Sequence, residues 1–178
     1  MGIFSSTYTK AGYVLDSIFY ITVITIGLII LSILEPIKLW PSILFLMSLG
    51  LFSWTFFEYF IHRFVLHGDS VLQRAHALHH DNPYQLIATS TLFGATLFTL
   101  ILFVPSLLLT NFWIGTSFTL GNLIGYTYYG WFHFMLHRQS SSNKWLKNKK
   151  KFHAIHHNFE NKNFGVTTSL WDHIFRTL

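Results

Sequence analysis

The stretch that decides the fold is EYFIHRFVLHGDSVLQRAHALHHD, residues 58–81, which holds five of the eleven histidines. The other six lie within residues 131–173, and ten of the eleven fall into four tight groups. The groups are His62 and His67; His76, His79 and His80; His133 and His137; and His153, His156 and His157. Residues three or four apart share one face of an α-helix, so each of the last three groups can point in one direction. His62 and His67 are five apart, about 140° around an ideal helix, so this pair requires a helix end or a distortion.

These histidines predict a centre of two metal ions. Imidazole is the commonest protein ligand for zinc, iron and copper, and one ion takes roughly four to six ligands. Ten imidazoles are too many for one ion and suit two, whereas structural or surface histidines would not fall into four spaced groups. The chain has no cysteine, which excludes thiolate ligands, and only seven Asp and Glu residues. A carboxylate-bridged site with Glu-x-x-His on its helices is therefore absent.

Composition predicts an integral membrane protein. Hydrophobic residues are 51% of the chain and charged residues 11%, against about 25% charged in a soluble domain. Four stretches have about the 20 apolar residues that a span requires: residues 13–34, 40–57, 86–109 and 112–131. Only Thr110 and Asn111 separate the last two, which predicts a helical hairpin, and Pro105 predicts a kink near the end of the third. We expect one domain over residues 1–178 and no removable signal peptide.

The order of spans and histidines predicts one histidine-rich face. The first two groups follow the second span and the last two follow the fourth, so two crossings return the chain to the same side. With four spans both termini lie there, and that side then holds eleven of the twelve Lys and Arg residues, with Lys38 opposite. The positive-inside rule makes this face cytoplasmic. The expected fold is all-α, with about four transmembrane helices and a cytoplasmic, histidine-rich helical cap from residues 58–81 and 131–173.

A glycine pattern within the fourth predicted span and a lysine-rich run after it each indicate a common structural role. Gly121 and Gly125 form a G-x-x-x-G pattern, which indicates close helix packing rather than the wall of a lipid-tail groove. The lysine-rich run at residues 144–151 is expected to contact anionic lipid rather than nucleic acid, because it follows a membrane span closely.

A dimetal centre held by neutral histidines just beneath a bilayer favours oxidation of a lipid. Such a centre is strongly electropositive and can activate oxygen within reach of a C–H bond near a lipid head group. Asp69, Asp81 and Asp172 are the expected carboxylate partners of the imidazole N–H groups. The alternative from a different class is a metal-handling membrane protein, a transporter or store. A transporter would place its ligands near the midplane of its spans, whereas these histidines follow the span ends, which favours the enzyme.

The sequence also resembles a known superfamily. The histidine order, together with EYFIHRFVLH at residues 58–67 and NFGVTTSLWDHIFRT at residues 163–177, is similar to the fatty acid hydroxylase/sterol desaturase superfamily. Within it, the resemblance is to the fatty acid 2-hydroxylases and compact bacterial relatives. It implies a non-haem di-iron oxygenase that uses O2 and two electrons to hydroxylate a fatty acyl chain at or near its 2-position. The ten grouped histidines carry over as ligands, whereas His173 lies where relatives commonly have a non-ligating residue and is left out.

Departures from the family pattern leave the substrate and the partner open. The 2-hydroxylases of eukaryotes often carry a cytochrome b5 domain ahead of the membrane part, and this sequence shows none. We therefore expect electrons from a separate protein of the cytochrome b5 or ferredoxin type. The neighbourhoods of the second and third motifs, Asp81–Tyr84 and Tyr128–Gly130, also differ from the 2-hydroxylases. Hydroxylation or desaturation of a sterol or carotenoid stays an alternative. Iron is expected in the active form, and zinc can replace it on purification, because histidine sites bind both.

Overall fold

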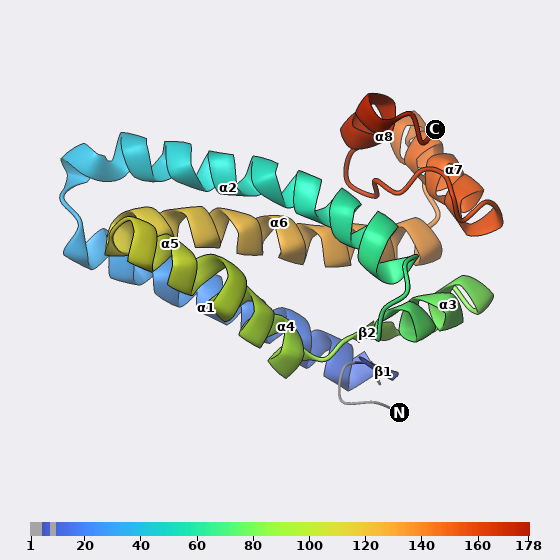
Figure 1. Cartoon of the computed structure of the whole chain (residues 1–178), viewed down its shortest axis with the longest axis horizontal. Coiled ribbons are helices and arrows are strands. Elements are labelled where there is room, and N and C mark those ends of the chain that lie inside the picture. The colour runs from blue at the N-terminus through green and yellow to red at the C-terminus, as the bar shows by residue number, and fades with distance from the viewer. Residues whose placement is uncertain (1–4, 8–9) are drawn as a thin grey trace. The chain divides into compact units, whose positions relative to one another are not determined.

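The computed structural model describes residues 5–7 and 10–178, and it is helical almost throughout (Figure 1). In chain order the elements are β1 (Ser5–Thr7), α1 (Lys10–Leu34), η1 (Ile37–Leu39), α2 (Trp40–Phe60), η2 (Ile61–Leu66), α3 (Gln73–Asp81), β2 (Ile87–Thr89), α4 (Thr91–Leu97), η3 (Phe98–Phe103), α5 (Val104–Leu109), α6 (Phe112–Arg138), α7 (Lys144–Asn158) and α8 (Leu170–Phe175). The all-α prediction is confirmed. Two strands of three residues, β1 and β2, pair with each other and were not predicted.

The chain clusters into two compact units. The apolar unit consists of Tyr8–Trp54 and Thr89–Thr127, and the histidine unit consists of Met1–Thr7, Thr55–Ala88 and Tyr128–Leu178. Helices α2 and α6 contribute residues to both units. The buried core of the apolar unit includes Tyr20 and Leu31 of α1, Ile43 of α2, and Leu120 and Leu123 of α6. The histidine unit has its own core, made by Phe132, Leu136, Leu146 and Val166.

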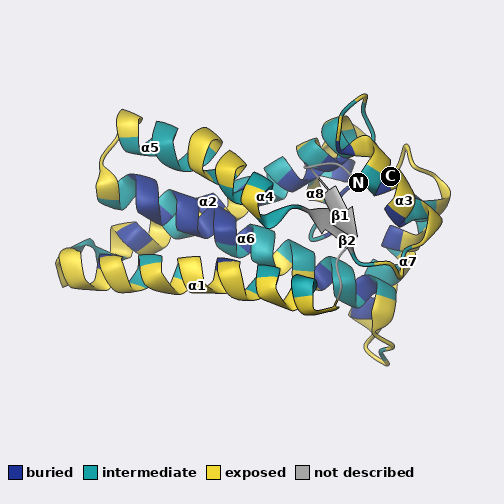
Figure 2. Ribbon diagram, turned by 90° about the horizontal axis from the view of Figure 1, so that it is seen from below, coloured by how far each residue is buried: buried dark blue, intermediate teal, exposed yellow. Residues whose placement is uncertain are grey.

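Three helical stretches are long and apolar enough to cross a membrane: Lys10–Leu34, Ile37–Leu66 and Thr91–Leu109. They match the first three predicted spans. Most apolar side chains of α1 are exposed, as Figure 2 shows, which suits a helix surrounded by lipid acyl chains. The fourth predicted span lies within α6, but α6 is not among the three stretches, and it buries the polar side chains of Ser117 and Asn122. A fourth crossing therefore stays a prediction.

The third predicted span begins later than expected. Residues 87–89 form β2, and the helix begins at Thr91. Its middle is the π-helix η3, which ends two residues before Pro105. Proline cannot donate a backbone hydrogen bond to the preceding turn, which accounts for a distortion just before Pro105. The distortion lies in the middle of the helix, earlier than the kink that the sequence predicted near its end. Only Thr110 and Asn111 separate α5 from α6, and a Cβ atom added at Gly115 of α6 would lie 3.0 Å from the backbone nitrogen of Leu107 in α5, so the predicted hairpin is confirmed.

Glycines allow α2 and α6 to pack closely in the apolar unit. A Cβ atom added at Gly121 would lie 2.0 Å from the carbonyl oxygen of Met47, and one added at Gly50 would lie 2.2 Å from that of Phe118. At Gly125 an added Cβ would meet Trp54 at 2.6 Å. Any side chain at these positions would overlap the neighbouring helix, so the packing interpretation of the G-x-x-x-G pattern is confirmed.

Candidate metal centre

A π-helical turn brings His62 and His67, which are five residues apart, to the same side of the helix. Within η2 the backbone N–H of His67 donates to the carbonyl of His62 at 3.1 Å, a hydrogen bond between residues five apart. A π-helix closes its turns with such bonds, whereas an α-helix joins residues four apart. The extra residue in the turn lets the two imidazoles lie on the same side. The predicted distortion is therefore present.

The ten predicted histidines lie in two groups of five, and all belong to the histidine unit. Group 1 contains His62, His67, His76, His80 and His156, and group 2 contains His79, His133, His137, His153 and His157. The ligand atoms of each group all lie within 4.8 Å of one another. Helix α3 contributes two histidines to group 1 and one to group 2, and α7 does the reverse. The i, i+4 pair of each helix enters one group, and the residue at i+3 turns to the other.

The spacing of nitrogen atoms in both groups suits a metal ion. Nine Nε2–Nε2 distances lie between 2.8 and 3.2 Å, for example 2.9 Å from His67 to His76 and 2.8 Å from His137 to His153. Two imidazoles bound at right angles to one ion, with bonds of about 2.0–2.1 Å, have nitrogen atoms about 2.9 Å apart. Five imidazoles directed at one point, each buried or half-buried and with no carboxylate among them, are a donor set for a zinc- or iron-like ion. The residues present therefore fit the implied metals.

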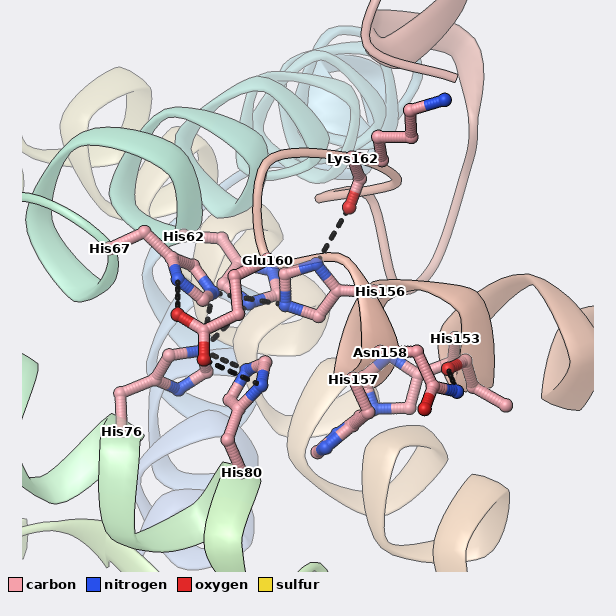
Figure 3. Close-up of polar contacts among 11 residues, drawn as sticks. His62, His67, His76, His80, His153, His156, His157, Asn158, Glu160 and Lys162 are labelled. Atoms are coloured by element: carbon pink, nitrogen blue, oxygen red, sulfur yellow. Dashed lines mark hydrogen bonds and ion pairs between the residues drawn. The ribbon is translucent and has the colours of Figure 1, made fainter.

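Backbone carbonyls fix the tautomer of two group 1 histidines. The Nδ1–H of His62 donates to the carbonyl of Phe164 at 2.5 Å. The Nδ1–H of His156 donates to the carbonyl of Lys162 at 2.7 Å, as Figure 3 shows. A carbonyl oxygen only accepts, so the proton of each neutral imidazole lies on Nδ1. Both rings then direct an unprotonated Nε2 lone pair into group 1, as metal binding requires.

Two buried carboxylates hold the loop that carries Phe164. Asp172 accepts the backbone N–H groups of Phe164 and Gly165, each at 2.8 Å. Glu58 accepts those of Val166 and Thr167 at 2.7 and 2.9 Å. Four consecutive N–H groups are thus bound by α8 on one side and α2 on the other. The loop presents its carbonyl to His62 because these two carboxylates fix its backbone.

The predicted carboxylate partners have different positions. Asp172 is fully buried and contacts the loop rather than a histidine, so its effect on His62 passes through the Phe164 peptide. Asp69 and Asp81 are exposed, and among the described residues neither side chain hydrogen-bonds a histidine.

Sequence reasoning missed Glu160, whose carboxylate lies beside His67 and His80. Its position three residues after His157 could have pointed to it, because a carboxylate so near the last histidine group can reach an imidazole N–H. Ligation by the ten histidines stays a prediction, and His173 is exposed on α8, outside both groups.

We expect Asp172→Asn to destabilise the protein by about 2–4 kcal/mol, since three hydrogen bonds to a buried carboxylate are weakened and an amide NH2 faces backbone N–H donors. Thermal unfolding in detergent, with metal content measured on the same samples, checks this. Asp69→Asn is the comparison, because Asp69 is exposed, and we expect a change within about 0.5 kcal/mol. Equal losses for both variants would contradict the role assigned to the loop.

Burial keeps the grouped histidines neutral. Removal from water, followed by repulsion from neighbouring imidazoles, lowers the pKa of His79 and of His137 to about 3. Burial lowers the pKa of His67 to about 4 and that of His157 to about 3. Neutral imidazoles are the form that binds metal, so these sites are ready for ions at neutral pH.

The same pKa shifts predict acid sensitivity. In the unfolded chain histidines titrate near 6.5, whereas the folded, metal-free groups stay neutral until about pH 3–4. Between these values the unfolded state binds more protons, so the free energy of unfolding decreases as the pH falls below about 6.5 and is insensitive to these groups above it. Melting temperatures of chelator-treated protein from pH 5 to 8 should be level above pH 7 and fall steadily below 6.5. A higher melting temperature at pH 5 than at pH 7 would contradict this.

A family model described as fatty acid hydroxylase matches residues 47–177. The chain belongs to the fatty acid hydroxylase family. Within this family it is similar to the dihydroceramide fatty acyl 2-hydroxylase FAH1 of Arabidopsis thaliana, at 36% identity over 156 residues. It is also similar to the ceramide very long chain fatty acid hydroxylase SCS7 of Saccharomyces cerevisiae, at 35% identity over 153 residues. The fatty acid 2-hydroxylase of Homo sapiens is 30% identical over 165 residues. The solved structure of full-length scs7p, with only the hydroxylase domain visible, matches with a TM-score of 0.75 at 27% identity.

These matches cover most of this chain but less of the relatives. They include 78% of this chain and 62% of FAH1, 75% and 38% for SCS7, and 83% and 42% for the human protein. The structural match covers 93% of this chain and 66% of the scs7p chain. The chain therefore spans about three fifths or less of the length of these curated fatty acid hydroxylases. Family membership confirms the resemblance seen in the histidine order, and with three apolar helices it makes the chain an integral membrane protein.

Proposed function

We propose that this chain is a membrane-bound, non-haem dimetal oxygenase that hydroxylates a fatty acyl chain at the 2-position. The observation that carries the proposal is the pair of five-histidine groups, whose Nε2 atoms converge within 4.8 Å. The names of the relatives support the acyl chain of a ceramide-type lipid as the substrate, because they are 2-hydroxylases or ceramide fatty acid hydroxylases. Iron is the metal proposed for the active form, with zinc able to replace it.

The proposed reaction balances with one external electron donor. The C–H bond beside the acyl carbonyl is replaced by C–OH, one oxygen atom of O2 enters the product, and the other leaves as water. Two electrons and two protons complete the balance, and we propose a separate cytochrome b5- or ferredoxin-type protein as their electron source. When bound, two redox-active ions held by neutral imidazoles supply the electron transfer and the positive charge that oxygen activation needs.

The chain's own residues hold the centre in one geometry. The carbonyls of Phe164 and Lys162 orient two imidazoles, and Glu58 and Asp172 fix the loop that carries Phe164. These contacts hold the imidazoles that they reach in fixed orientations, which is what a metal centre of defined geometry needs. The polar head of the substrate is proposed to lie at the cytoplasmic face. This orientation rests on the eleven of twelve Lys and Arg residues that four spans would place there.

Untargeted lipid mass spectrometry on cells that express this chain tests the function. We expect a new lipid species about 16 mass units heavier than its parent, with the added hydroxyl located beside the acyl carbonyl by fragmentation. A species about 2 units lighter would assign desaturation instead. Unchanged lipids, with iron bound and a competent donor present, would contradict the proposal and favour a role in metal handling.

A further inference from the structure

Glu160 lies where one carboxylate reaches two ligands of group 1. Its Oε2 is 3.4 Å from Nδ1 of His67, and its Oε1 is 3.8 Å from Nδ1 of His80 (Figure 3). His67 follows η2, His80 is the penultimate residue of α3, and Glu160 follows α7. A single side chain therefore spans the three segments that supply group 1.

The two histidines need an acceptor on the outer side of the ring. Both direct Nε2 into group 1, so a neutral, metal-binding ring carries its proton on Nδ1. Nδ1 of His80 is buried and makes no hydrogen bond of normal geometry among the described residues, although the backbone of His157 lies close to the ring. Glu160 is the carboxylate nearest to it that the structure describes, at ion-pair distance. A modest closure of the carboxylate would turn both contacts into hydrogen bonds.

The outer contacts of group 1 come from alternate residues of one loop. Glu160 offers its side chain to His67 and His80, Lys162 its carbonyl to His156, and Phe164 its carbonyl to His62. Of these three residues, Glu160 alone contacts the histidines through a charged group, because Lys162 and Phe164 use their backbone carbonyls. The two other carboxylates near the loop, Glu58 and Asp172, already accept backbone N–H groups. Glu160 is thus available to offset the charge of an ion bound by neutral imidazoles.

We propose that Glu160 is the positioning carboxylate of group 1, holding His67 and His80 with the proton on Nδ1 and strengthening both as ligands. It acts on the group 1 ion and leaves group 2 unchanged, so the two ions differ in how firmly they are held. The inference rests on the proposed dimetal centre, but it concerns metal affinity and does not depend on which lipid is oxidised.

Metal release from Glu160→Gln tests the proposal. The full chain is loaded with 57Fe in detergent and titrated with a chelator, and the iron retained is counted. Loss of a partner of metal-bound histidines costs roughly 10–100-fold in affinity, so we expect one of two irons to leave at a 10–100-fold lower chelator concentration. The second iron should leave as in the unmodified chain. Glu35→Gln is the matched control, because it makes the same chemical change in the apolar unit.

Mössbauer spectra of the loaded proteins separate positioning from a general structural effect. If Glu160 orients two ligands of one ion, Glu160→Gln changes the quadrupole doublet of one iron only, while the melting temperature of the metal-free protein stays the same. The proposal would be overturned if Glu160→Gln weakened the binding of both irons equally, or if it released iron at the same chelator concentration as Glu35→Gln. A chain that binds no iron would also overturn it. Two bound irons with the expected release from Glu160→Gln, but no hydroxylated lipid, would instead overturn the proposed function and leave the inference standing.

Discussion

Replacing His79 and His156 together by alanine is expected to lower the formation of the hydroxylated lipid more than about 100-fold. Each of these residues is the single histidine that its helix contributes to the opposite group. The double variant therefore removes one ligand from each group while every helix stays in place. Lipid mass spectrometry measures the product, and metal analysis of the purified variant should show both ions bound more weakly.

His173→Ala is the matched control for this variant. His173 is exposed and lies outside both groups, and its Nδ1–H donates to the backbone carbonyl of Ser169 at 2.7 Å. We expect its lipid product and metal content to match those of the unmodified chain. Full product from the double variant would mean that the histidine groups do not support the reaction.

Gly121→Val is expected to give the largest loss of stability, about 3 kcal/mol or more, seen as a fall in melting temperature of roughly 6–12 °C in detergent. The added Cβ would lie 2.0 Å from the carbonyl oxygen of Met47 and 2.9 Å from the backbone nitrogen of Leu51. Both atoms belong to the backbone of α2, so no change of side-chain rotamer relieves the overlap. The helices must separate, which removes packing on both sides of the contact.

Gly130→Ala provides the comparison on the same helix. Beyond its own helical turn, a Cβ added at Gly130 meets no atom of the described residues within 4 Å. Alanine is a better helix former than glycine by up to about 1 kcal/mol, so we expect an unchanged or slightly raised melting temperature. A similar fall for both variants would show that α6 tolerates no substitution of glycine, rather than that its packing against α2 is close.

Local sequence was sufficient to identify the members of the candidate centre. The i, i+3 and i+4 spacings of the histidines follow from helix geometry, so His76, His80, His153 and His157 could be placed on common faces before any contact was known. The spacing of His62 and His67 also predicted a distortion, because an undistorted α-helix would place residues five apart on different faces. The four apolar stretches required only hydropathy, because a bilayer imposes one length on every span.

Contacts between segments far apart in the chain decided the rest. The division into two groups depends on how α3 and α7 pack within the histidine unit. This packing places His79 of α3 in group 2 and His156 of α7 in group 1. The contact of Glu160 with His67 and His80 joins residues 80 to 93 positions apart, and that of Glu58 with Val166 joins residues 108 apart. A sequence pattern reports which residues share one helix face. Which of these faces meet, and which carboxylate lies between them, is set by packing, so only the tertiary structure could show it.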